Sequence, residues 1–160
     1  MNAHDVLMYG HRWVHRHLDG LTGEQYLAGG VCGLWSVKDI VAHLASYEWV
    51  LVDVLKGFIE PGPAPLLDKF TSQRGDEFNA GQVSLRKDWP PARVLADYDA
   101  GYECAQSLLP RITLELQRQP GTLPWYGSEY SLDDLLVYQY YGHKREHMAQ
   151  VSLYRDTLKK

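Results

Sequence analysis

Apolar residues recur every three or four positions along four long stretches of the chain, a pattern that predicts four amphipathic helices. The first stretch covers about residues 3–19. One face of that helix would carry Leu7, His11, Val14, Leu18 and Leu21. The second stretch begins at Ser36, which with Asp39 three residues later resembles a capping box, the reciprocal pair of hydrogen bonds that starts many helices. It runs to the proline-rich segment at residues 61–65.

Two further helices are predicted in the second half of the chain. Pro90 and Pro91 suit the first turn of the third helix, where a missing backbone N–H costs nothing, and Pro110 should end or kink it. The fourth helix begins at Ser131. No stretch alternates in the period-two manner of a strand, and no internal repeat is visible. The pattern therefore predicts an all-α fold, a four-helix bundle, built as a single domain over residues 1–160.

The connections between these helices differ in character. Residues 22–34 hold four glycines and are predicted to be a loop. Residues 66–89 have irregularly spaced apolar positions, and we expect a partly helical, lid-like connection there. The whole connection after the second helix spans about 30 residues, which is long enough to cross the bundle instead of making a tight hairpin.

Composition narrows the choice of function classes. Apolar residues make up 45% of the 160 residues and charged residues 22%, the balance of a folded globular chain. The net charge is −4 and no basic patch is present, so nucleic-acid binding is not expected. No signal peptide and no apolar run of about 20 residues is found, so membrane association is not expected either. The two cysteines, Cys32 and Cys104, lie far apart, which favours a reducing, cytoplasmic location.

Three histidines are the strongest chemical signal in the chain. His143 and His147 form an H-x-x-x-H pair on the last predicted helix, at positions where the apolar period requires buried residues. His43 lies along the edge of the apolar stripe on the second helix and should also point inward. An unpaired imidazole costs a few kcal/mol to bury, and a metal ion relieves that cost by binding the ring nitrogens. Three such ligands would leave an open position for water or substrate on an ion such as zinc.

The alternative is that these histidines are ordinary core or surface residues with hydrogen-bond partners. An H-x-x-x-H pair alone often arises by chance on helices, whereas a third inward-pointing histidine on a separate helix favours the metal site. Gln139 and Glu146 flank His143, and either could hold an imidazole N–H. Glu146 suits a solvated surface charge equally well.

No residue is predicted outright to be catalytic, and two residues are candidates. His11 lies on the apolar stripe of the first helix and could line the same cavity, whereas His15 and His17 are expected to face solvent. Tyr140, like Tyr47, lies one helical turn from a predicted ligand and could orient a metal-bound water or a substrate. The alternative, which we favour, is that both tyrosines are core residues at a polar boundary.

These motifs resemble those of a known family. The run LWSVKDIVAHLASYE is similar to the second-helix signature of the DinB/YfiT-like superfamily, in which a Trp-Ser turn leads into a helix with a ligand histidine. The run YGHKREHMAQ resembles the last-helix H-x-x-x-H of that family, and the LTGEQ turn and the helix order also agree. The resemblance covers nearly the whole chain. It implies a four-helix bundle with a long crossover connection, in which zinc or nickel is bound by His43, His143 and His147.

The resemblance also suggests a reaction. The superfamily includes thiol S-transferases that use bacillithiol or mycothiol, an isomerase that depends on mycothiol, and DNA-damage-inducible members. We therefore expect a metal-dependent thiol S-transferase with a low-molecular-weight thiol cosubstrate and a small electrophile as substrate. The alternatives are a metal-dependent hydrolase and a non-catalytic metal-binding protein of a stress response. Members of this family often pair, so a homodimer is also expected.

Overall fold

The computed structural model describes residues 2–159, so Met1 and Lys160, the ends of the predicted domain, lie outside the described residues. The fold is all-α, as predicted, and no β-strand occurs within residues 2–159. The helical elements, in chain order, are α1 (Ala3–Leu18), α2 (Gly23–Leu27), α3 (Val37–Ile59), α4 (Pro65–Ser72), α5 (Gly75–Ser84), α6 (Pro91–Leu108), the 3-10 turn η1 (Leu109–Arg111), α7 (Leu114–Arg118), α8 (Leu132–Leu135), the π-helical segment η2 (Leu136–Gly142) and α9 (His143–Thr157).

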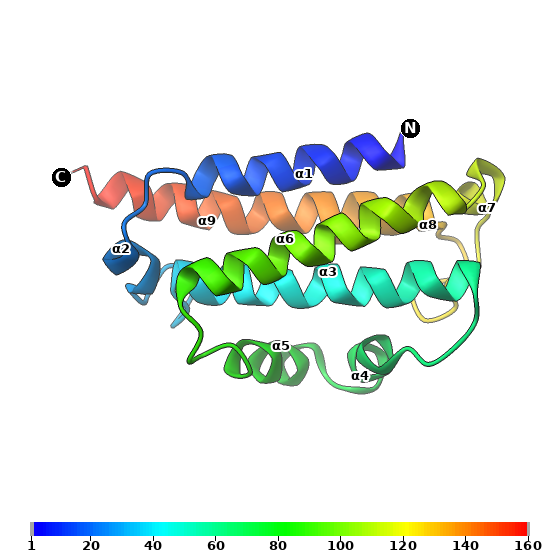
Figure 1. The fold of residues 1–160 in the computed structure, drawn as a ribbon, viewed down its shortest axis with the longest axis horizontal. Coiled ribbons are helices and arrows are strands. Elements are labelled where there is room, and N and C mark those ends of the chain that lie inside the picture. The colour runs from blue at the N-terminus through cyan, green and yellow to red at the C-terminus, as the bar shows by residue number, and fades with distance from the viewer. Residues whose placement is uncertain (1, 160) are drawn as a thin grey trace.

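Four long helical runs lie alongside one another: α1, α3, α6 and the continuous run α8–η2–α9 (Figure 1). The first helix packs against α9 and η2, while α3 packs against α6. Helices α4 and α5 lie along another side of α3 and carry the chain back, so that α6 begins near the start of α3 (Figure 1). The long connection after α3 therefore runs the length of that helix.

Capping contacts explain where the main helices begin. Ser36 Oγ accepts a hydrogen bond from the Asp39 backbone N–H at 3.2 Å, and Asp39 Oδ2 accepts one from Ser36 N–H at 2.9 Å, which confirms the predicted capping box. Ser131 and Asp134 make the same reciprocal pair at the start of the last helical run. Proline lies in the first turn of α6, and that helix ends just before the 3-10 turn that contains Pro110.

Two connections contain more helix than their glycines suggest. The prediction of a loop over residues 22–34 is wrong at its start, because Thr22 and Gln25 form another capping box and begin the short helix α2. The connection over residues 66–89 is partly helical, as predicted, and holds most of α4 and all of α5. Two backbone N–H groups in the first turn of α4 donate to Asp53 Oδ2, at 2.9 and 3.2 Å, so α3 supplies the cap that α4 lacks.

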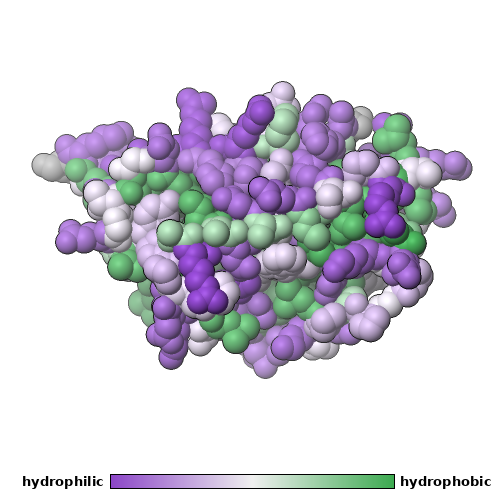
Figure 2. Space-filling view, viewed as in Figure 1, coloured by the Kyte–Doolittle hydropathy of each residue, from purple (hydrophilic) through white to green (hydrophobic). Residues whose placement is uncertain are grey.

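The core is arranged around α3 in two apolar clusters. Toward the start of α3, Leu44 belongs to a cluster with Tyr98 and Met148. Toward its end, Leu51 belongs to a second cluster that includes Leu135. On the outside, hydrophilic residues cover much of the edge formed by α1 (Figure 2). None of the helices among the described residues is both long enough and apolar enough to cross a membrane.

Candidate metal centre

Three histidine side chains from two helical runs converge at one point in the interior. His43 comes from the first half of α3, His143 begins α9, and His147 follows one turn later. The Nε2 atom of His143 lies 2.9 Å from that of His43 and 3.0 Å from that of His147. His43 is 2% exposed and His147 is 9% exposed. The structure therefore brings together all three histidines that the apolar stripes single out, and they could hold a metal ion.

The π-helical segment η2 leads directly into this centre. The His143 backbone N–H donates to the carbonyl of Tyr138, five residues back, instead of the usual four. Such a bulge rotates every residue that follows it relative to a regular helix, and π-bulges occur often at functional sites. Here the residue that ends the bulge is His143. The position of the bulge therefore sets how His143 and His147 face α3.

A hydrogen bond to Gln150 assigns the proton of His147 to one of its two ring nitrogens. His147 Nδ1 lies 2.9 Å from Gln150 Oε1, an acceptor, so Nδ1 holds the hydrogen and Nε2 presents its lone pair to the centre. His143 Nε2 lies between the Nε2 atoms of His43 and His147, and it can donate at most one proton to either of them. Protons alone can satisfy only one of the two short contacts around His143, whereas a metal ion satisfies all three nitrogens as ligands.

Burial keeps all three imidazoles neutral near pH 7. Desolvation lowers the pKa of His43 to about 2, with further lowering by His143 and His147. Desolvation and the neighbouring His147 lower the pKa of His143 to about 4, although the backbone carbonyl of Gln139 opposes this. Desolvation also lowers the pKa of His147, against the opposing effects of Gln150 and Glu146. Neutral imidazole is the form that binds metals.

Aromatic rings enclose part of the centre. The ring of Tyr47 lies 4.7 Å from the rings of both His43 and His143, measured between centroids, and Trp35 lies 5.1 Å from His43. The Tyr47 hydroxyl donates to Asn79 Oδ1 of α5 at 3.4 Å. Burial raises the pKa of Tyr47, so its phenol stays protonated at neutral pH. Asn79 of α5 thus holds the neutral hydroxyl of Tyr47, whose ring packs beside two of the histidines.

A buried ion pair lies beside the centre, and the sequence pattern did not predict it. Lys144 Nζ lies 2.6 Å from Glu48 Oε1, and both side chains are 1% exposed. Burial raises the pKa of the Glu48 carboxyl, while the Lys144 ammonium opposes this. Both residues lie one turn from apolar core positions, Glu48 after Leu44 and Lys144 after Tyr140. A charged residue on an apolar stripe was the signal that could have identified them.

The two candidate catalytic residues lie elsewhere. Tyr140 is 2% exposed and packs within the second apolar cluster, where burial raises its pKa well above the usual value. His11 groups with His15 and Asp99, apart from the three central histidines. His15 was expected to face solvent, but its Nε2 lies 2.7 Å from Asp99 Oδ1. Neither candidate gains support as a group that acts at the metal centre.

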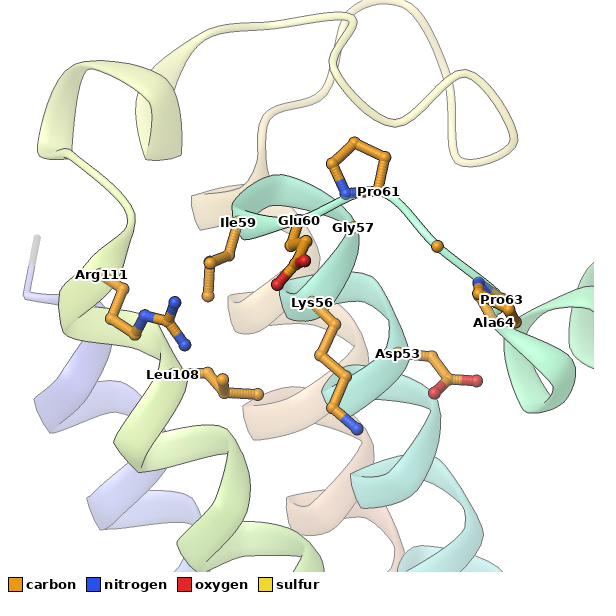
Figure 3. A pocket seen from close by; sticks show the side chains of 11 residues that line it. Asp53, Lys56, Gly57, Ile59, Glu60, Pro61, Pro63, Ala64, Leu108 and Arg111 are labelled. Atoms are coloured by element: carbon orange, nitrogen blue, oxygen red, sulfur yellow. The ribbon is translucent and has the colours of Figure 1, made fainter.

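A cavity of about 480 Å³ lies near the other end of α3 (Figure 3). Its lining includes Asp53, Lys56, Glu60 and Arg111, and Asp53 is already occupied in capping α4. Asp53 is ten residues beyond His43 along α3, or about 15 Å of helix. The cavity therefore does not form part of the histidine centre.

The comparison with protein families agrees with the geometry. The model of the DinB superfamily matches residues 11–151, a span that contains all three central histidines. The chain belongs to the DinB superfamily. No curated protein and no solved structure matched the chain. Membership in the superfamily and the three converging imidazoles are the two findings from which we infer a function.

Proposed function

We propose that this DinB-superfamily protein is a metal-dependent enzyme in which His43, His143 and His147 hold one divalent ion, zinc or nickel. The observation that carries the proposal is the convergence of three Nε2 atoms in a largely buried place, with His147 Nδ1 turned away from them and 2.9 Å from Gln150 Oε1. Nitrogens bound to a tetrahedral zinc ion lie roughly 3.3 Å apart, and the Nε2 atoms of His43 and His147 lie 2.9 and 3.0 Å from that of His143, a few tenths of an ångström closer.

The residues around the histidines suit a centre that turns over a substrate. Three protein ligands leave a position free, and an ion held there supplies Lewis acidity that lowers the pKa of a thiol or water. Gln150 keeps the lone pair of His147 turned inward. Tyr47 offers a neutral phenol whose ring packs beside two of the ligands, and its hydroxyl could donate to a substrate on releasing Asn79 Oδ1.

The reaction we propose is transfer of a small thiol to an electrophile. The sulfur forms a bond to an electrophilic carbon, the thiol loses its proton to solvent, and the leaving group departs with its electron pair. The support for this reaction class is the resemblance of the helix motifs to the thiol S-transferases of the superfamily. A hydrolase and a non-catalytic metal-binding protein would use the same ligands, so activity assays must separate them.

Other features belong to the same proposal. We take the four long helical runs as a single four-helix bundle domain that acts on a small molecule, with no nucleic-acid or membrane partner. A homodimer remains a prediction, and two large side chains on the last helical run are exposed enough to meet a second copy: Tyr138 is 60% exposed and Leu153 is 71% exposed. Both cysteines are free, as a reducing, cytoplasmic location requires.

Metal analysis tests the centre. In purified protein the three-histidine centre should account for one equivalent of zinc or nickel, and both His143→Ala and His147→Ala should lose that equivalent. The matched control is His4→Ala, since the His4 side chain is 54% exposed on α1. Retention of every bound equivalent in both variants would show that these histidines hold no metal.

Activity assays then test the reaction. A panel of low-molecular-weight thiols with an activated aryl halide should give turnover that His143→Ala abolishes and His4→Ala leaves unchanged. If metal-loaded protein hydrolyses esters or amides instead, the hydrolase is supported. If it does neither, the transferase proposal is rejected in favour of the metal-binding role.

A further inference from the structure

A second group of metal-ligating side chains lies between α1 and α6. His11 and His15 are one turn apart on α1, and Asp99 lies on α6. His15 Nε2 is 2.7 Å from Asp99 Oδ1, and His11 Nε2 is 3.5 Å from the same oxygen. The three ligand atoms all lie within 4.8 Å of one another. None of these residues belongs to the His43 centre.

The arrangement contains more than one ion pair. Beside the His15–Asp99 hydrogen bond, His11 Nε2 faces the same carboxylate oxygen from 3.5 Å. The other ring nitrogen of His11, Nδ1, is buried and has no hydrogen-bond partner among the described residues. His11 is mostly buried, its Nε2 has only the 3.5 Å contact with Asp99, and a metal ion at Nε2 would supply that nitrogen with a ligand bond.

Packing holds the His11 ring in this orientation. It stacks on Tyr102 with ring centroids 3.8 Å apart and planes 4° from parallel, and on Tyr98 with centroids 5.3 Å apart. Two flanking tyrosines restrict rotation of the imidazole about its side-chain bonds. The ligand is thus positioned before any ion arrives, which is what a specific site requires.

The group is also reachable from outside. The His11 side chain is 17% exposed, that of His15 is 39% exposed and that of Asp99 is 32% exposed. A surface cavity of about 510 Å³ adjoins it, with His15 in its lining along with Leu18 and Tyr26. An ion can therefore enter, and positions on it remain open to solvent or a small ligand.

From the convergence of two imidazole nitrogens and one carboxylate oxygen on a fixed, accessible point, we infer that His11, His15 and Asp99 form a second site for a divalent transition metal. Two nitrogens and one carboxylate oxygen are a ligand set typical of zinc, cobalt, nickel and ferrous iron, and not of calcium or magnesium. The carboxylate gives this site one more negative charge than the three-histidine centre. The site is independent of the proposed function.

The test is a count of bound metal in matched variants of the full chain. Metal-free protein at micromolar concentration is titrated with zinc by calorimetry and, separately, with cobalt by visible absorption. The wild type should bind two equivalents, and both His15→Ala and Asp99→Asn should bind one. The control His4→Ala, an exposed histidine on the same helix, should bind two. Circular dichroism confirms that each variant is folded.

The design separates this site from the His43 centre. In His143→Ala, the equivalent that remains should be the one that Asp99→Asn removes, so the double variant should bind no metal with micromolar affinity. If His143→Ala loses nothing while Asp99→Asn loses one equivalent, the proposed function fails and the second site stands. If the wild type binds a single equivalent that persists in both His15→Ala and Asp99→Asn, the second site is rejected.

Discussion

At the scale of single residues, the buried pair of Glu48 and Lys144 places two charges where α3 and α9 would otherwise bury apolar side chains. Replacing Lys144 with Met should lower the free energy of unfolding by about 3–5 kcal/mol, because Glu48 would remain buried without its counter-charge. The double variant Glu48→Gln with Lys144→Met should recover most of that loss. Urea unfolding of the metal-free variants measures both effects. Additive losses in the double variant would contradict the coupling.

Gln150 offers a second prediction at the same scale. It touches His147 Nδ1 but does not face the point where the three Nε2 atoms meet. Gln150→Leu should weaken zinc binding at the three-histidine centre by about 10–100-fold, because the His147 proton loses its acceptor and the ring loses its anchor. Competition with a zinc chelator measures the affinity.

Gln150→Glu is the matched control, since it keeps an acceptor oxygen for the Nδ1 proton. It should bind zinc at least as tightly as the wild type. Equal affinities for the Leu variant and the wild type would show that Gln150 does not position His147.

The sequence identified some of these side chains and missed others for a physical reason. His43, His143 and His147 lie on apolar stripes, so the helical period alone shows that they point inward. Asp99 and Gln150 do not lie at positions of an apolar stripe, so the helical period does not single them out. Their roles depend on which helices become neighbours, and that is decided by tertiary packing, which a local pattern does not contain.

At the scale of helices, the closeness of α3 and α6 depends on one glycine. A Cβ added at Gly101 would lie 2.7 Å from Glu48 Cβ, well inside normal contact. Gly101→Ala should therefore push α6 away from α3 and cost about 1–3 kcal/mol of unfolding free energy. Thermal and urea unfolding check the change.

Gly57→Ala supplies the control for that prediction. Gly57 is also helical, within α3, and a Cβ there would meet nothing within 4 Å. Alanine should stabilise this position by a few tenths of a kcal/mol up to about 1 kcal/mol, because it restricts the unfolded chain. If both substitutions had the same sign, the close contact at Gly101 would not be the cause.

The helix boundaries show where sequence patterns suffice. Ser36 and Ser131 are predicted correctly as helix starts because capping signals are local: both serines form capping boxes, although the box was predicted only at Ser36. The π-helical segment Leu136–Gly142 was not predicted, since the apolar period passes through it without interruption. A bulge is stabilised by how the helix packs against its neighbours, and Gly10 of α1 approaches there, with an added Cβ 3.4 Å from the Tyr140 carbonyl oxygen.

At the scale of the whole molecule, the all-α fold followed from helical periodicity, although the central helix α3 is buried on more than one side, with α6 on one and α4 and α5 on another. The return path of the chain was less predictable. Residues 66–89 have irregular apolar spacing because α4 and α5 are short and rest on α3 through a few aromatic contacts, such as Tyr47 with Phe70 at 5.4 Å between ring centroids. Short helices of this kind leave a weak periodic signal.

The stability of the metal-free protein should depend on pH through its buried histidines. Folding lowers the pKa of His43 from 6.5 to about 2 and that of His143 to about 4. Below pH 6.5 the unfolded chain therefore takes up protons that the folded chain does not, so stability is complete above that pH and is lost as the pH falls toward 4. Each such histidine contributes a slope of up to about 1.4 kcal/mol per pH unit.

Urea unfolding between pH 4 and 8, in the presence of a chelator, measures this dependence. His43→Leu should flatten the acid limb, because the variant removes one group whose protonation favours the unfolded state. His4→Ala should leave it unchanged, since that side chain is exposed. Adding saturating zinc should raise the stability of the wild type above pH 6.5 and make its loss toward pH 4 steeper, because protons then also compete with the ion for the three nitrogens. An acid limb that is identical in His43→Leu and the wild type would mean that His43 is not buried as a neutral imidazole.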